Sequence, residues 1–272
     1  MKTSRLRLVA CDRLSITVRE AFMSIPIYSA ACAIGIALAT MPSEAHAGDA
    51  QAATQEPPAV IELFTSQGCS SCPPADALFG DYAKREGVIA LSFHVDYWDY
   101  LGWQDRFASA DFSERQRQYA RARGDGAVYT PQAVVNGRGH VVGSSDASIE
   151  AALGAKQSVA DAVHVRAAVT ETSLDIRVEP ANPWSIDADI LLAIVQSSAT
   201  VKIKRGENAG KTITYRNIVR SLTRIGGWDG TAATLAQPIP VAGGVDGASY
   251  VVLVQRANAG PILGATVARD TR

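Results

Sequence analysis

Cysteine and an excess of either charge are what this sequence has least of. Four cysteines in 272 residues are too few for a scaffold held together by disulfides. The 26 basic and 27 acidic side chains give a formal net charge of -1, whereas binding nucleic acid by bulk charge needs a clear basic excess. Hydrophobic residues reach 47%, which is enough to build a core. The composition predicts a globular protein of one large or two small domains, with no nucleic-acid partner.

The first 47 residues have the layout of a secretory signal peptide. Basic residues precede an apolar run from Ala21 to Met41, and small residues, Ala45 and Ala47, occupy the two positions that a signal peptidase reads. We predict cleavage after Ala47 and a periplasmic or secreted protein without stable membrane insertion. The alternative is a retained membrane anchor, because the apolar run is about long enough to cross a bilayer.

Hydrophobic patterning divides the rest of the chain into two regions. After a flexible leader at 48–58, strand-like and helix-like segments alternate through 59–157 in the order β-α-β-α-β-β-α. Helical crossovers should make the first strands parallel, and Asn136-Gly137 predicts a hairpin that adds an antiparallel edge. Residues 158–272 show strand-like runs separated by turn residues. We therefore predict an α/β domain followed by a smaller all-β, sandwich-like domain.

Cleavage would leave one pair of cysteines, in the motif Cys69-Ser-Ser-Cys72 between a predicted strand at 60–65 and a predicted helix. The N-terminus of a helix presents unpaired N–H groups and the positive end of a dipole, which lower the pKa of a thiol. Two thiols at this spacing can exchange disulfides, one attacking and the other resolving. We predict Cys69, nearer the strand and more exposed, as the nucleophile and Cys72 as the resolving residue. Because Pro73 and Pro74 follow, Cys72 should lie just outside the helix.

Two other interpretations of the cysteine pair stay open. It could be half of a zinc site, with His or carboxylate ligands that lack motif spacing. It could also be a static structural disulfide, which an exported location permits, although a bridge that closes so short a loop restrains the unfolded chain little. We expect no metal and no organic cofactor.

Two further residues could complete a redox site. Thr130-Pro131 lies at a predicted strand entrance, where a cis proline usually has a function. The pattern here resembles the thioredoxin fold. The resemblance implies that Pro131 packs against the cysteine motif and that nearby backbone groups position a substrate. It also implies that Glu62 is the buried carboxylate that handles a proton near Cys72. A partly exposed strand carboxylate is the alternative for Glu62.

Longer stretches extend this resemblance to nearly the whole mature chain. They lie at 62–76, 93–98, 129–132 and 205–210. These stretches are similar to a secreted thioredoxin-like family catalogued only as a domain of unknown function. The resemblance implies the fold and a redox-type site, but no substrate. Gly68 departs from thioredoxin itself, which has a tryptophan before its first cysteine.

An aromatic loop supplies candidate substrate contacts. Its members are Tyr97, Trp98, Tyr100 and Trp103. The cluster could be a groove for an extended peptide or a piece of local core that anchors the loop. Together with the cysteine motif, it leads us to predict that Thr130, Trp98 and Gly68 bind the substrate.

Two weaker signals point elsewhere. His94 and Asp96 share a strand face and could hold a metal with Asp99, or form a hydrogen-bonded pair at the strand end. Residues 206–212 imitate a phosphate-binding loop, but the spacing of the glycines is wrong, so we reject nucleotide binding.

The sequence predicts an exported thiol–disulfide oxidoreductase that acts on envelope proteins or small disulfides and exchanges electrons with an unknown redox partner. The alternative is a non-catalytic secreted binding protein in which Cys69–Cys72 is a fixed bridge. Redox behaviour separates the two, since a structural bridge stays closed under mild reductant.

Overall fold

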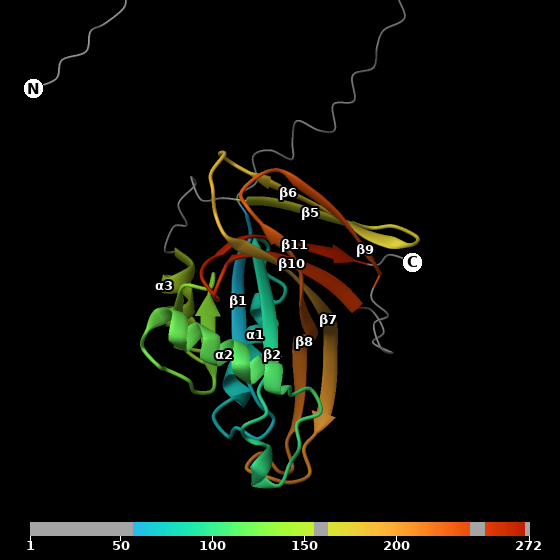
Figure 1. The fold of residues 1–272 in the computed structure, drawn as a ribbon. Coiled ribbons are helices and arrows are strands. Elements are labelled where there is room, and N and C mark those ends of the chain that lie inside the picture. Colours follow the sequence, from blue (N-terminus) through green and yellow to red (C-terminus); the bar gives the residue numbers. More distant parts are fainter. Residues whose placement is uncertain (1–56, 155–162, 240–247, 270–272) are drawn as a thin grey trace, which may run out of the picture. The chain divides into compact units, whose positions relative to one another are not determined.

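The computed structural model describes residues 57–154, 163–239 and 248–269, and all of them belong to one compact unit (Figure 1). The predicted signal peptide at 1–47 and the predicted leader up to residue 56 lie outside the described residues, as does the boundary predicted at 157/158. No helix within the described ranges is long and apolar enough to cross a membrane.

The first half of the chain has the predicted order of strands and helices. In chain order the elements are β1 (Ala59–Thr65), α1 (Pro73–Tyr82), β2 (Val88–His94), the short 3-10 helix η1 (Asp99–Leu101), α2 (Ala110–Arg123), β3 (Gln132–Val135), β4 (Gly139–Val142) and α3 (Asp146–Gly154). β1 pairs in parallel with β2 and antiparallel with β3, which forms a hairpin with β4. The parallel crossover and the antiparallel hairpin edge are therefore confirmed.

β1 is buried on both faces because helices cover each side of the sheet (Figure 1). Ile61 and Leu63 pack with residues of α1 and α3. Val60 and Phe64 pack on the other side, in the core beneath α2. Side chains alternate between the two faces along a strand, so a strand covered on both sides is apolar almost throughout. A single carboxylate, Glu62, interrupts it.

The strands of the second half join this sheet instead of forming a domain of their own. They are β5 (Val163–Val169), β6 (Ser173–Pro180), β7 (Ala188–Lys202), β8 (Thr212–Trp228), β9 (Ala233–Pro238), β10 (Ala248–Arg256) and β11 (Ile262–Arg269). The large sheet is mixed, with the strand order β11-β10-β7-β8-β2-β1-β3-β4, and β5-β6-β9 form a small antiparallel sheet. The fold is thus mixed α/β. The prediction of a separate all-β domain at 158–272 is corrected, because four strands of that region belong to the same sheet as β1 and β2.

The second half does contain a sandwich of two sheets. One layer is the small sheet, and the other is part of the large sheet. In β10, Val252 and Val254 pack with residues of the small sheet. Val251 and Leu253 of the same strand pack into the core beneath α2. The alternation along one strand therefore serves two cores, which is why the two halves of the chain form one unit.

β8 connects the two halves by lying beside β2. Ser92 pairs with Ile218 in parallel, and the Ser92 hydroxyl donates to the carbonyl oxygen of Arg216 at 2.8 Å. The side-chain amide of Asn217 donates to the carbonyl oxygen of Ala90 at 3.0 Å. This pairing carries the loop between β7 and β8, residues 203–211, to the junction of β1 and α1.

Candidate functional site

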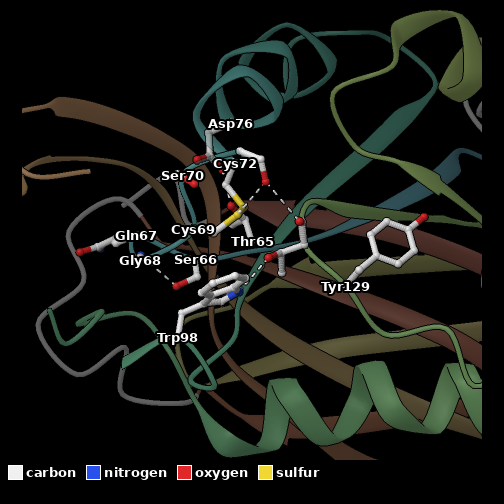
Figure 2. Close-up of a disulfide and its surroundings, with 12 residues drawn as sticks. Thr65, Ser66, Gln67, Gly68, Cys69, Ser70, Cys72, Asp76, Trp98 and Tyr129 are labelled. Atoms are coloured by element: carbon white, nitrogen blue, oxygen red, sulfur yellow. Dashed lines mark hydrogen bonds between the residues drawn. A yellow bond between two sulfur atoms is a disulfide. The ribbon is translucent and has the colours of Figure 1, made fainter. Parts of the chain in front are cut away.

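A disulfide joins Cys69 and Cys72 at the junction of β1 and α1 (Figure 2). Cys72 is the N-cap of α1 and so lies just outside the helix, as predicted. Its backbone angles, φ -79° and ψ -33°, are nevertheless right-handed helical although Pro73 follows. The predicted difference in exposure is not found, because Cys69 is 1% and Cys72 0% exposed. Ser70 and Ser71 are the exposed part of the motif.

The predicted proline segment lies against this disulfide. Ser71 Oγ lies 3.4 Å from Cys69 Sγ and donates to the carbonyl oxygen of Thr130 at 3.4 Å. The Thr130–Pro131 peptide bond is cis, and the carbonyl oxygen of Pro131 accepts from the backbone N–H of Gly143 at 2.9 Å. Ser71 thus bridges the cysteine motif to the segment before β3.

Trp98 and Gly68 form one wall of the site. The indole N–H of Trp98 donates to Thr130 Oγ1 at 2.8 Å, and Figure 2 shows the ring beside the disulfide. A Cβ atom on Gly68 would lie 3.0 Å from Trp98 Cβ, so the indole occupies the space that a larger residue at position 68 would need. The three residues predicted to bind substrate, Thr130, Trp98 and Gly68, are therefore brought together beside the cysteines.

The aromatic loop is partly anchored and partly exposed. Besides Trp98, the Tyr97 hydroxyl donates to Gln116 Oε1 at 3.0 Å and the Trp103 indole donates to Gln67 Oε1 at 2.8 Å. Tyr100, by contrast, is 79% exposed. Three of the four aromatic residues thus belong to the local packing, and Tyr100 faces solvent.

Glu62 has a different partner from the one that the resemblance implied. Its side chain is fully buried, and its Oε1 accepts from Arg115 Nε at 3.0 Å and from a terminal guanidinium nitrogen at 2.7 Å. Arg115 also donates to Tyr119 Oη and to Gln255 Oε1, at 2.8 and 3.1 Å. These residues lie on the α2 side of the sheet, whereas α1 and Cys72 lie on the other side. Glu62 is therefore buried, but as half of an ion pair.

Asp76 is the buried carboxylate on the side of the disulfide. Its backbone N–H donates to the carbonyl oxygen of Cys72 at 3.0 Å, and its Oδ1 accepts from Thr65 Oγ1 at 2.7 Å. Its Oδ2 is buried and, within the described ranges, has no hydrogen-bond partner. Burial raises the pKa of Asp76 to about 7, against the opposing effects of His94 and Thr65. Asp76 can therefore take up or release a proton near neutral pH.

A buried histidine–aspartate pair lies in the electrostatic neighbourhood of Asp76. His94 Nδ1 and Asp105 Oδ2 are 2.6 Å apart, and neither side chain is exposed. Burial raises the pKa of Asp105, but the His94 ring and several hydrogen bonds, one from the backbone N–H of Gln67, outweigh it and lower that pKa below its usual value. Asp96 instead accepts from a serine of α2. In the part of the chain that the structure describes, no cluster of three His, Cys, Asp or Glu side chains could hold a metal.

The loop between β7 and β8 also contacts the cysteine motif. Asn208, which is 1% exposed, donates from Nδ2 to the carbonyl oxygens of Gln67 and Cys69 at 2.9 and 2.7 Å. Glu207 Oε2 accepts from the backbone N–H of Ser70 at 3.3 Å. The cysteine loop, residues 67–72, is thus hydrogen-bonded to a segment that follows it by more than a hundred positions.

Four residues of the site were missed by reasoning from the sequence: Asp76, Asp105, Glu207 and Asn208. For Asp76 a signal existed, because it follows Cys72 by four positions, one turn of the predicted helix. The other three left no local pattern. The stretch 205–210 contributed to the family resemblance, yet nothing in it indicated contact with the cysteines.

Fold and site together define a mixed α/β protein with a disulfide-bonded Cys-x-x-Cys motif where a strand meets a helix. The family described as "Protein of unknown function (DUF1223)" matches residues 60–255, and the chain belongs to this family. The resemblance to a domain of unknown function is therefore confirmed.

Several solved structures are similar to this chain, and two of them differ widely in sequence identity. One is an X-ray crystal structure of a protein from Agrobacterium tumefaciens, with 38% identity, a TM-score of 0.69, and coverage of 78% of this chain and 95% of that chain. The other is HBP35 of Porphyromonas gingivalis, with 13% identity, a TM-score of 0.55, and coverage of 78% and 74%; this likeness concerns the fold alone. No curated protein matches the chain.

Proposed function

We propose that this protein is an exported thiol–disulfide oxidoreductase with a thioredoxin-like site, in which Cys69 and Cys72 alternate between disulfide and dithiol. The observation that carries the proposal is Asp76, a buried carboxylate one helical turn after Cys72 whose pKa is raised to about 7. Burying such a group costs stability, and a static bridge has no use for it. Buried acids with a pKa near neutrality are typical of sites that move protons.

In the reducing direction, the Cys69 thiolate attacks one sulfur of the substrate disulfide. That bond breaks, the other substrate sulfur leaves as a thiolate and takes a proton from solvent, and a mixed disulfide with Cys69 forms. Cys72 then gives its thiol proton to the Asp76 carboxylate and attacks Cys69 Sγ. The substrate sulfur leaves, takes the proton from Asp76, and the Cys69–Cys72 disulfide remains. Two electrons have passed to the substrate, and a dithiol partner must return them; oxidation is the reverse sequence.

The substrate would approach over the exposed side of the motif. Ser70 and Ser71 are exposed, and the Thr130 backbone and the Trp98 indole border them. These groups suit an extended polypeptide, whose backbone can bond to Thr130 and whose side chains can pack on the Trp98 ring. A small disulfide would use the same face with fewer contacts.

The experiment is to trap the mixed disulfide. In Cys72→Ser, the thiol of Cys69 attacks but nothing resolves, so discrete covalent partners should accumulate in the exported fraction and disappear when a reductant is added. Cys69→Ser is the matched control, because its single remaining thiol is the resolving one. Equal, featureless patterns from both variants would contradict the proposal.

A second candidate, a binding protein with a fixed bridge, is favoured by one observation: both cysteines are almost completely buried. For this candidate, the disulfide of the wild-type protein should stay closed in a millimolar mixture of reduced and oxidised glutathione. For the oxidoreductase, the two thiols should become open to alkylation in that mixture, and the fraction alkylated should follow the glutathione ratio.

A further inference from the structure

The loop between β7 and β8 holds the cysteine motif through a specific arrangement of donors and acceptors. Asn208 uses its side-chain N–H groups on the carbonyl oxygens of Gln67 and Cys69. Lys211 Nζ donates to Asn208 Oδ1 at 2.7 Å, which sets the orientation of the amide. With Asn208 fixed in this way, its neighbour Glu207 reaches the backbone N–H of Ser70.

Gln67 ties this loop to the rest of the site. Its backbone N–H donates to Asp105, its carbonyl oxygen accepts from Asn208, and its side-chain Oε1 accepts from Trp103. The loop also packs directly on Trp103, since a Cβ atom on Gly206 would lie 3.3 Å from Trp103 Cβ. The loop and the residues before Cys69 are therefore joined by hydrogen bonds and direct packing.

The position of Glu207 has an electrostatic consequence for Cys69. Free N–H groups at the start of a helix stabilise a thiolate. Here Pro73 and Pro74, at the start of α1, have no N–H, and the N–H of Ser70, which lies between Cys69 and the helix, is bonded to a carboxylate. The Cys69 sulfur and carbonyl oxygen contact neutral groups, the hydroxyl of Ser71 and the amide of Asn208. A negative charge next to Cys69 disfavours its thiolate and thereby favours the disulfide.

We infer that the loop between β7 and β8 sets the redox potential of the Cys69–Cys72 pair and keeps the pair reducing. Glu207 opposes the Cys69 thiolate, and Asn208 holds Glu207 and Cys69 in place; both are positioning residues. The other charged groups of this region are Asp76 on α1, the His94–Asp105 pair, and three cations on the loop itself, Lys204, Arg205 and Lys211. Lys204 and Arg205 are exposed, and among the charged side chains of this loop, which the structure describes throughout, only Glu207 bonds to the backbone next to Cys69. The inference rests on the proposed function and extends it, because a reducing pair donates electrons to the disulfides of its substrates.

The test compares Glu207→Gln with the full wild-type chain. Removing the charge should lower the pKa of Cys69, measured from the pH dependence of its alkylation rate, by about half a unit. At pH 9 the equilibrium with glutathione should shift about threefold toward the dithiol, which corresponds to ~15 mV. Both differences should shrink in 0.5 M salt, because the charge is exposed. A purely structural role would produce no such salt dependence.

The matched control is Glu114→Gln, the same change on α2, where the carboxylate bonds to Arg117 and Arg121 and not to the cysteine motif. This variant should keep the wild-type pKa and equilibrium. If the wild-type disulfide equilibrates with glutathione but Glu207→Gln does not differ from it, or shifts toward the disulfide, the role of the loop is refuted and the proposed function stands. A wild-type disulfide that never opens refutes the proposed function itself.

Discussion

Asn208 donates a hydrogen bond of 2.7 Å to the carbonyl oxygen of Cys69, although 139 positions separate the two residues in the sequence. A second bond from the same amide reaches the carbonyl oxygen of Gln67, so both donors of the Asn208 side chain are used on one short segment. Because Asn208 is buried, these carbonyl groups have no easy replacement from solvent. The cysteine loop therefore depends on the second half of the chain for its shape.

Asn208→Ala should loosen the cysteine loop. Leaving buried carbonyl groups unpaired costs about 3 kcal/mol in the free energy of unfolding, measured by urea titration. The variant should also open locally more easily. If the free energy of local opening falls by ~1.4 kcal/mol, dithiothreitol should reduce the disulfide roughly tenfold faster. Asn217→Ala removes a side-chain bond between β8 and β2 and serves as the control. It should lose stability without faster reduction; equal reduction rates in the two variants would contradict the prediction.

Asp76→Asn should change how stability depends on pH. The folded-state pKa of Asp76, about 7, lies above its value of 3.8 in the unfolded chain. The folded protein thus binds the proton more tightly, and stability falls as the pH rises from about 4 to 7. The amide that replaces the carboxyl group cannot ionise, so the variant should gain as much as ~4 kcal/mol over the wild type at pH 8 and almost nothing at pH 4. Urea titrations at the two pH values measure this.

The same substitution should affect the redox reaction in the opposite way. In the wild type, the carboxylate that accepts the Cys72 proton is present above about pH 7, so the resolving step should accelerate as the pH rises through that value. In Asp76→Asn, release of a trapped mixed disulfide should be slow, and the inflection near pH 7 should be lost. An unchanged inflection would assign the proton transfer to another group.

The Glu62–Arg115 ion pair should matter for stability and not for proton transfer. Arg115→Met leaves the buried Glu62 carboxylate without its partner and should cost about 3–5 kcal/mol. The double variant Glu62→Met/Arg115→Met removes both charges and should return most of that loss, because apolar side chains can replace a buried ion pair. Urea titration gives both values. The double variant should also exchange disulfides at the wild-type rate. A large loss of exchange would show that Glu62 takes part in the reaction.

Gly143→Ala should disturb the packing behind Pro131. A Cβ atom at position 143 would lie 2.6 Å from Leu63 Cδ1 and 3.2 Å from Pro131 Cβ, so core atoms must shift, at a cost of about 1–3 kcal/mol. Gly139→Ala, at the start of β4, the strand that ends just before Gly143, meets no atom within 4 Å and should change stability by less than ~0.5 kcal/mol. Thermal unfolding of the two variants compares them directly; similar melting temperatures would contradict the prediction.

Much of the first half of the fold was predictable because its signals are local. The apolar run at 60–65, the helical spacing after Cys72 and the Asn136-Gly137 turn each report the conformation of their own segment. The family resemblance added the segment at 129–132, and the structure places Thr130, the residue before the cis Pro131, against the cysteine motif. The predicted strand carboxylate, Glu62, shows the limit of this reasoning. Its burial was predictable, but its partner Arg115 was not.

By itself, then, the sequence determined which segments are strands and helices, where the cysteine pair lies, and that these elements have apolar faces to bury. Only the tertiary structure decided which strands lie side by side, that Asp76 and not Glu62 shares a side with the disulfide, and that Asn208 and Glu207 cover the motif. The physical reason is that the preferences visible as a pattern in the sequence act only over a short distance along the chain. Backbone preference and alternation act over a few neighbouring residues, whereas a strand such as β10, apolar on both faces, accepts many partners and finds its own only when the whole core packs.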